Sequence, residues 1–326
     1  MSGKNSVWGV VGKGFKIYLR YIHKFFLYMT FPVFGQLLGL VLIFVPVYYL
    51  QGAIPELSSK YEFFSDPSRI MALVLIAILP GLILLLSAFW KYLVAYSALN
   101  SMTQSALVSG KIYDFPAHNS IVNKNIWNFL IIWLVLSMLA ILSLSPLFAL
   151  ICGILMIFFI PVFQIFTFEQ DKNGFECIKR SFELVKKDLG KVLGILLILS
   201  IFLFVLSIVA TILSSNYIDA DKYLSGYSNL ILGLQPLVNL NKEFAQYAEY
   251  GINFQITTEM ISALILLSAT GFIVWGYTLP LRSVCWTLWY KKNSNTGSEK
   301  KAKKSSKKQL DPEILRRANL DDDEEV

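Results

Sequence analysis

Six apolar stretches alternate with polar segments along the chain, and each approaches the length of a membrane-spanning helix. A helix needs about 20 mainly apolar residues to cross the hydrocarbon core of a bilayer. Only Ser143-Leu144-Ser145-Pro146 separates the third stretch from the fourth, and a proline after two serines ends a helix well. We therefore expect a tight hairpin there. The predicted spans are residues 27–50, 70–90, 127–142, 147–168, 192–213 and 261–281 or longer.

A second pattern precedes each odd-numbered span: apolar side chains recur at helical spacing on one face, and basic side chains fall on the other. Residues 13–26 and 175–189 show this pattern, and residues 117–128 show a weaker form of it. A basic amphipathic helix of this kind lies in the plane of the membrane interface. The chain is therefore predicted to contain three units, each a surface helix followed by a two-span hairpin.

The composition agrees with this pattern and excludes a soluble globular protein. Hydrophobic residues make up 55% of the 326 residues, charged residues make up 16%, and the mean hydropathy is +0.57. Soluble domains carry about 25% charged residues, so this chain has too few charges to cover a water-facing surface. The expected fold class is all-α: a polytopic membrane bundle of six transmembrane helices with amphipathic cytoplasmic interfacial helices.

The lysines and arginines set the expected orientation, because cytoplasmic loops of membrane proteins are enriched in positive charge. Outside the C-terminal tail, seventeen of them fall on one side of the six predicted crossings and four on the other. Both termini are therefore expected in the cytoplasm. The expected regions are a cytoplasmic amphipathic helix at 1–26, the membrane domain at 27–290 and a disordered charged tail at 291–326.

The residue types that carry most enzyme chemistry are scarce. The chain has two histidines and three scattered cysteines, which form no metal-ligand or nucleophile constellation, so no catalytic residue, metal or cofactor is expected. A lysine cluster at 300–308 is a feature of nucleic-acid binders, but it lacks the aromatic residues on which bases stack. We expect neither an enzyme nor a nucleic-acid partner.

Anionic lipid headgroups are the expected ligands of the basic surface helices. Arg180 and Ser181 stand at headgroup level in the helix at 175–189, and the planar fork of arginine suits a phosphate. The alternative is that Arg180 pairs with Glu176 on a helix that only sets the topology. The candidate headgroup contacts are Lys16, Arg20, Lys24, Lys179, Arg180, Ser181, Lys186 and Lys187.

Small and polar residues inside the spans are expected to hold helices together. Gln36 and Gln164 are polar side chains within spans, and interhelical hydrogen bonds are the expected role, with a solute pathway as the alternative. Two pairs of glycines spaced four apart predict close helix packing. These glycines are Gly35, Gly39, Gly190 and Gly194.

A distinctive string joins the fourth span to the fifth: a glutamate ends the span, a glycine opens a helix, and that helix carries an Arg-Ser pair. The residues are Phe168-Glu169, Gly174-Phe175-Glu176 and Ile178 to Lys187, with Trp286 to Lys291 at the end of the sixth span. These motifs resemble the membrane-domain family named after glycerophosphoryl diester phosphodiesterases. The resemblance covers roughly residues 10–292 and implies a six-span protein of a bacterial or archaeal inner membrane, of unassigned activity. The chain departs from fused members of that family because it has no catalytic domain, so the family name implies no reaction here.

Taken together, these patterns predict a non-enzymatic membrane protein with a lipid- or envelope-related scaffolding or partner-binding role. Its expected partners are membrane lipids, other proteins or a second copy of the chain. The alternative is a small-solute transporter or permease subunit, in which a helix broken at Pro46, Pro161 or Pro280 would line a central cavity. An intramembrane enzyme ranks third, because no acid–base pair can be placed at one depth.

Overall fold

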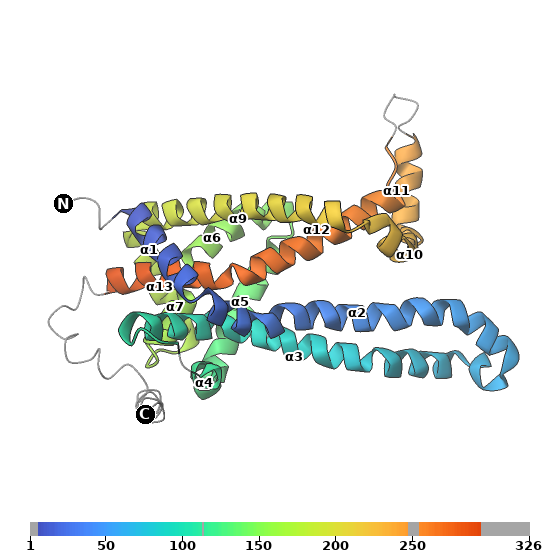
Figure 1. Ribbon diagram of the computed structural model, residues 1–326, viewed down its shortest axis with the longest axis horizontal. Helices are drawn as coiled ribbons and strands as arrows, with labels where there is room; N and C mark the ends of the chain where they lie inside the picture. Colours follow the sequence, from blue (N-terminus) through green and yellow to red (C-terminus); the bar gives the residue numbers. More distant parts are fainter. Residues whose placement is uncertain (1–5, 113, 247–253, 295–326) are drawn as a thin grey trace. The chain divides into compact units, whose positions relative to one another are not determined.

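The computed structural model describes residues 6–112, 114–246 and 254–294, and within these ranges every regular element is a helix (Figure 1). The predicted all-α class is confirmed for this part of the chain. The predicted disordered tail, from residue 295 onward, lies outside the described residues. The elements are α1 (Val7–Arg20), α2 (Ile22–Lys60), the 3₁₀ helix η2 (Glu62–Ser65), α3 (Pro67–Val108), α4 (Phe115–Lys124), α5 (Ile126–Leu142), α6 (Pro146–Phe158), α7 (Val162–Phe168), α8 (Gly174–Lys187), α9 (Leu189–Tyr217), α10 (Ala220–Leu232), α11 (Gln235–Gln246), α12 (Thr258–Tyr277) and α13 (Leu279–Ser294).

Several of these helices suit a membrane by length and composition. Five apolar helices are long enough to cross a bilayer, and the pair α4–α5 would add a sixth, although it is bent by 81°. Two of the five join consecutive helices, α6 with α7 and α12 with α13. The apolar helices indicate a membrane-embedded protein. The five candidates are Ile22–Leu50, Pro67–Val108, Pro146–Phe168, Leu189–Tyr217 and Thr258–Ser294.

The first two long helices extend beyond the predicted membrane spans. α2 begins at Ile22 and continues to Lys60, and α3 continues to Val108, so both helices extend past the apolar stretches that end at residues 50 and 90. Hydropathy marks only the part of a helix that suits hydrocarbon, whereas the backbone hydrogen bonds continue through polar residues. Pro46 lies inside α2, so the break considered there does not occur.

The other two prolines lie at real breaks. Pro161 is the N-cap residue of α7, three residues after α6 ends. Pro280 is the second residue of α13, which is separated from the end of α12 by the single residue Thr278. A proline has no amide hydrogen and excludes the preceding helical turn, which is why it is tolerated at the start of a helix.

A helix precedes each of three helical hairpins, at the places where the sequence predicted surface helices. α1 precedes α2–α3, α4 precedes α5–α6, and α8 precedes α9 and α12. The boundary of the first one is corrected: α1 covers Val7–Arg20, Tyr21 interrupts it, and residues 22–26 belong to α2. α8 starts with a capping box, in which the side chains of Asn173 and Glu176 each accept a hydrogen bond from the other residue's backbone amide at 2.9 Å.

The described chain forms two compact units. Unit 1 contains residues up to Met29, Trp90–Ser200 and the residues from Thr278, and unit 2 contains Thr30–Phe89 and Ile201–Tyr277. In unit 1 the buried apolar core includes Phe129 and Trp289. α1 packs on α13 in this unit, because Gly14 leaves space for the thiol of Cys285.

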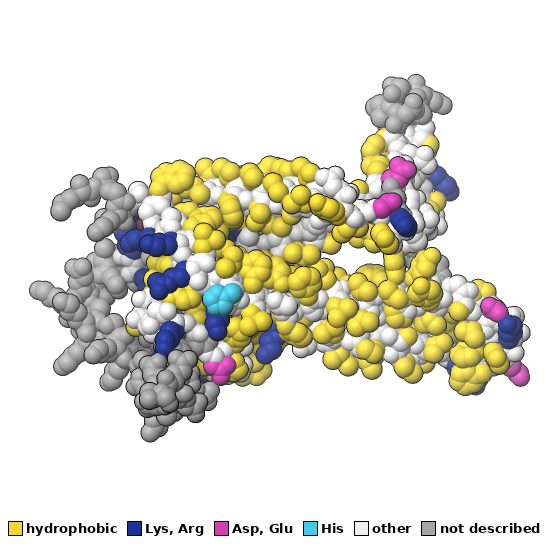
Figure 2. All heavy atoms as spheres, in the orientation of Figure 1, with side chains coloured by type: hydrophobic (Ala, Val, Ile, Leu, Met, Phe, Trp, Pro, Cys, Tyr) yellow, Lys and Arg dark blue, Asp and Glu magenta, His cyan; other side chains and the backbone are white. Residues whose placement is uncertain are grey.

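Unit 2 is built around close contact of α2 with α3. A Cβ atom added at Gly39 would lie 2.8 Å from the Leu85 amide nitrogen, and one added at Gly81 would lie 2.8 Å from the Gly39 carbonyl oxygen. Gly35 faces Ala88 in the same way. The two backbones therefore touch where glycines remove the side chains. Figure 2 shows hydrophobic side chains along both helices and charged ones gathered at the turn between them.

Two placements differ from the expectations for the small and polar residues. Gly194 packs against Val7 of α1, but a Cβ added at Gly190 would meet no atom within 4 Å, so the expected packing role of Gly190 is corrected. Gln36 donates to the carbonyl of Pro32 at 2.7 Å within its own helix, whereas Gln164 does bond another helix. Two glycines spaced four apart show which helix face lacks side chains, but not whether another helix packs against that face.

Candidate functional site

The exposed face of α8 combines aromatic and basic side chains. Phe175, Lys179, Phe182 and Lys186 are spaced by four, three and four residues, so they lie along one face of the helix. We call these four residues the basic–aromatic stripe. Phe175 is 65% exposed and Phe182 is 39% exposed, and both lysines are exposed, as is the adjacent Lys187. Such a face suits the boundary between headgroups and acyl chains, because the rings enter the apolar region while the ammonium groups stay in water.

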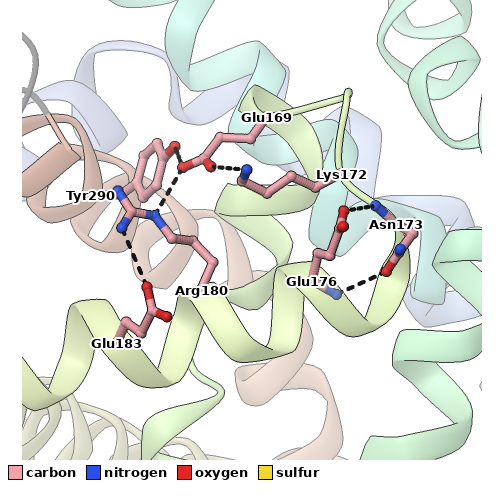
Figure 3. Close-up of polar contacts among 7 residues, drawn as sticks. All are labelled: Glu169, Lys172, Asn173, Glu176, Arg180, Glu183 and Tyr290. Atoms are coloured by element: carbon pink, nitrogen blue, oxygen red, sulfur yellow. Dashed lines mark hydrogen bonds and ion pairs between the residues drawn. The ribbon is translucent and has the colours of Figure 1, made fainter.

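Arg180 lies beside this stripe but is held by carboxylates (Figure 3). Its Nε lies 3.7 Å from Oε1 of Glu169, and its Nη1 lies 3.7 Å from Oε2 of Glu183. Tyr290 donates a hydrogen bond of 2.8 Å to the same Glu169 oxygen, and Lys172 lies 3.6 Å from the other one. The partner expected for Arg180, Glu176, instead completes the capping box of α8. Arg180 therefore connects α8 to α7 and α13, rather than presenting its fork to a phosphate.

Ser181 is fully buried on the opposite side of α8. Its hydroxyl donates to the carbonyl oxygen of Phe158 at 2.7 Å. Phe158 is the last residue of α6, where a carbonyl loses its helical donor, so this bond satisfies a group that the break at Pro161 leaves open. The expectation that Ser181 contacts a headgroup is corrected by this placement. Burial also raises the pKa of the neighbouring Cys177 thiol to about 12, which keeps it protonated and unreactive.

A second carboxylate fixes the junction between α8 and α9. Asp188 accepts hydrogen bonds from Lys191 at 2.9 Å, from Asn293 at 3.1 Å and from the Trp289 indole at 3.3 Å. Trp289 and Asn293 belong to α13, so this aspartate and Glu169 both tie the last helix to α8 or its neighbours. Together these contacts join α8 and its flanking residues to α13, while the stripe stays exposed.

The basic residues of the N-terminal segment also remain exposed. Lys16 and Arg20 are exposed on α1, and Lys24 is exposed near the start of α2. The buried side of α1 faces α13, so these cations project from a helix that is anchored to protein. Trp8 and Leu19 are exposed on the same helix, which repeats the combination found on α8.

Unit 1 also contains a buried hydrogen-bonded cluster that the sequence reasoning missed. Its centre is Asn100 of α3, whose Oδ1 accepts from Gln164 of α7 at 3.0 Å and from Ser283 and Thr287 of α13 at 2.6 and 3.2 Å. Ser97 and Thr167 share a further hydrogen bond of 2.9 Å beside it. We call these six residues the Asn100 cluster. All are buried, and Oε1 of Gln164 has no hydrogen-bond partner within the described residues.

The sequence contains a pattern of polar residues that indicates this cluster. Polar residues recur through the stretch 97–105, beyond the second predicted span, and six of these nine residues are buried polar side chains. This stretch lies outside the predicted spans, so its polar residues were given no role in the sequence analysis. A polar run that continues a long helix is instead a reason to expect hydrogen bonds between helices.

His118 docks α4 onto α3. It is fully buried, and its Nδ1 shares a hydrogen bond of 2.9 Å with the hydroxyl of Ser101. Burial lowers the pKa of His118 to about 4, and Nε2 has no hydrogen-bond partner within the described part of the chain. The next residue, Asn119, accepts a hydrogen bond of 2.6 Å from Tyr28 of α2. A neutral imidazole therefore belongs to the packed state of unit 1.

Among residues 6–112, 114–246 and 254–294, no group of three or more His, Cys, Asp or Glu side chains could hold a metal ion. No family of known proteins, no curated protein and no solved structure matches this chain. The resemblance to the membrane-domain family described above therefore stays a prediction.

Proposed function

We propose that this chain is a non-enzymatic integral protein of a prokaryotic inner membrane, with six membrane segments, both termini in the cytoplasm, and a lipid- or envelope-related scaffolding role. The apolar helices and the one-sided distribution of lysine and arginine support the placement. Other proteins or a second copy of the chain are its further expected partners.

The observation that carries this proposal is the basic–aromatic stripe of α8. Phe175 and Phe182 are exposed large hydrophobic residues on a helix whose polar face is basic. A basic residue near an anionic leaflet contributes about 1 kcal/mol of attraction, which falls off within a Debye length of roughly 8 Å at physiological salt. Anionic headgroups are therefore the proposed ligand of Lys179, Lys186 and Lys187, and Lys16, Arg20 and Lys24 are the proposed second contact region.

Lipid selectivity of the full-length protein tests the proposal. The protein is reconstituted in bilayers that contain a trace of spin-labelled phosphatidylglycerol or phosphatidylcholine, and the motionally restricted fraction of each lipid is measured. Replacing Lys179, Lys186 and Lys187 with Gln is expected to lower the preference for phosphatidylglycerol, since up to about 3 kcal/mol of headgroup attraction is removed. Raising the salt concentration should lower it in the same direction.

The matched control replaces three exposed lysines on the other predicted side, Lys60, Lys222 and Lys242, with Gln. This variant has the same change in net charge but leaves α8 intact. It should retain the wild-type preference for phosphatidylglycerol when the label reports the cytoplasmic leaflet. An unchanged preference in the α8 variant, or an equal loss in both variants, would contradict the headgroup proposal.

A small-solute transporter is the second candidate, and the Asn100 cluster is the observation that favours it. Gln164 lies shortly after the break at Pro161, and Ser283 lies shortly after the break at Thr278, so two interrupted helices bring polar groups to one asparagine. Interrupted helices of this kind form substrate sites in many transporters. Swelling of proteoliposomes in small uncharged polar solutes tests this function: a permeability that Asn100→Leu abolishes supports it, and no permeability above empty vesicles contradicts it.

A further inference from the structure

The hairpin α5–α6 differs from the other hairpins in the chemistry of its tip. Residues 125–168 contain no Asp, Glu, Lys, Arg or His, and the turn at Ser143–Ser145 is flanked by exposed leucines. Leu144 is 81% exposed and Leu147 is 77% exposed. The turn between α2 and α3, by contrast, carries the ion pairs Lys60–Glu56 and Arg69–Asp66. Charged residues mark a turn that reaches water, and this marker is missing from the α5–α6 tip.

Most backbone amides of this tip find acceptors within the hairpin, which suits a position in hydrocarbon. The amides of Ser143, Leu144 and Ser145 donate to carbonyls of the last turn of α5, at 2.9 to 3.2 Å. The Ser143 hydroxyl donates to the Ala140 carbonyl at 2.7 Å, and Pro146, the first residue of α6, has no amide hydrogen to satisfy. The carbonyl of Ser145 accepts two amides of α6. The turn between α2 and α3 instead uses an ionised side chain, because Asp66 accepts from both the amide and the hydroxyl of Ser68.

The base of the hairpin lies against α8, and this contact sets the level in the membrane from which the hairpin starts. Gly174, the first residue of α8, meets the Asn128 carbonyl and the Ile131 side chain of α5. Phe182 of α8 stacks on Phe158, the last residue of α6, with ring centroids 4.6 Å apart. Both helices of the hairpin therefore start at the level of α8, which is the helix proposed to lie among the headgroups.

The hairpin is too short to cross from that level, because α7, which completes the apolar segment Pro146–Phe168, follows the break at Pro161 and packs on α8 instead of lengthening the arm toward the tip. α6 has 13 residues and rises about 20 Å, and α5 from Ile131 to its end rises less than that, at 1.5 Å per residue. The hydrocarbon core is about 30 Å thick. α9 starts directly after α8 and has 29 residues, about 44 Å, which is ample for a full crossing. The tip of α5–α6 thus ends inside the hydrocarbon, while α9 passes through it.

We propose that α5–α6 is a re-entrant hairpin, whose tip at Leu144 and Leu147 binds lipid acyl chains inside the bilayer and does not reach the far side. The chain then crosses the membrane four times, through α2, α3, α9 and α12–α13. The distribution of positive charge is equally consistent with this topology, because a full hairpin and a re-entrant one both return the chain to the side of Lys124 and Lys172. The inference rests on the proposed membrane placement and on the interfacial position of α8.

Spin labels on single introduced cysteines test the depth of the tip in the full-length protein in bilayers. Leu144→Cys and Leu147→Cys report the tip from its two sides, and both side chains are exposed, so the label should not disturb packing. Ser59→Cys reports the exposed end of α2, and Asn123→Cys reports the exposed face of α4. The three native cysteines are buried, so the parent chain labelled in parallel gives the background.

Collision with oxygen, which concentrates in hydrocarbon, is compared with collision with a water-soluble nickel chelate. At both leucine positions we expect high oxygen accessibility and severalfold lower nickel accessibility than at Ser59 and Asn123. Nickel accessibility at Leu144 and Leu147 equal to that at Ser59 would overturn the re-entrant hairpin and leave the six-segment membrane placement intact. Low nickel accessibility at Ser59 as well would overturn the proposed placement of the turns, and the re-entrant hairpin with it.

Discussion

Units 1 and 2 have a similar apolar character but hold their helices together differently. In unit 2, α2 and α3 approach until the backbones touch at Gly39 and Gly81, and the buried side-chain amide of Gln36 bonds within its own helix. In unit 1, three helices meet at the oxygen of Asn100. Where the hydrophobic effect cannot drive helices together in lipid, close packing and interhelical hydrogen bonds are the two remaining means. The α2–α3 pair of unit 2 relies on the first, and the meeting of α3, α7 and α13 in unit 1 relies on the second.

Acidification should affect unit 1 most strongly, through His118. Its pKa is about 4 in the folded chain against an ordinary 6.5, so the unfolded chain binds the proton more readily. The stabilisation is complete above pH 6.5 and is lost as the pH falls from 6.5 toward 4, by about 2 kcal/mol at pH 5. Chemical unfolding in detergent micelles between pH 8 and pH 4.5 measures this loss. His118→Gln should flatten the pH dependence, and a variant that keeps the full dependence would contradict the assignment.

Adding a single methyl group to a glycine at the α2–α3 contact should destabilise unit 2. Gly39→Ala places a methyl group against the Leu85 backbone, which cannot move aside as a side chain can, so we expect a loss of about 1–3 kcal/mol in the free energy of unfolding. Gly271→Ala on α12 is the matched control, because a Cβ there meets no atom within 4 Å. It should be neutral or stabilising by up to about 1 kcal/mol, since alanine favours a helix. Equal effects of the two substitutions would refute the backbone contact.

Removing the shared acceptor, the side-chain oxygen of Asn100, should lower the stability of unit 1. Asn100→Leu leaves the side chains of Gln164, Ser283 and Thr287 without their common partner, and we expect a loss of about 1–3 kcal/mol. Gln36→Leu removes a bond that stays within one helix, so its cost should be smaller. Unfolding of both variants in the same micelles makes the comparison, and a larger effect at Gln36 would show that the cluster does not bind the helices.

The smallest expected effects come from two substitutions on α8, one in a residue that holds the helix in place and one in a residue proposed to bind lipid. Arg180→Gln should lower stability by no more than about 1 kcal/mol, because its ion pairs are partly exposed, and should leave lipid selectivity unchanged. Lys179→Gln should do the reverse, because no ion pair in the described residues involves its ammonium group. Thermal unfolding and the spin-labelled lipid assay measure the two properties on the same preparations. Loss of selectivity in Arg180→Gln would return this arginine to the headgroup site.

Much of the architecture could be predicted from sequence, because it depends on local periodicity. A helix that enters hydrocarbon must be apolar over its whole surface, and α9 shows this pattern. An interfacial helix must have one apolar and one polar face, and α8 shows that pattern. The full lengths of α2 and α3 do not follow from hydropathy, since helical hydrogen bonds do not stop where hydropathy falls. The break at Pro161 was recognisable as one of three prolines, but the chain alone did not distinguish it from Pro46.

The sequence by itself determined which segments are helices, which of them suit a membrane, and which face of α8 is basic and aromatic. Only the tertiary structure decided that Arg180 pairs with Glu169, that Ser181 closes the end of α6, and that Asn100 meets Ser283. Helix formation and amphipathicity depend on neighbours three or four residues away along the chain. Hydrogen-bond partners in the interior are separated by up to 187 residues, so they are set by how helices pack and not by any local pattern.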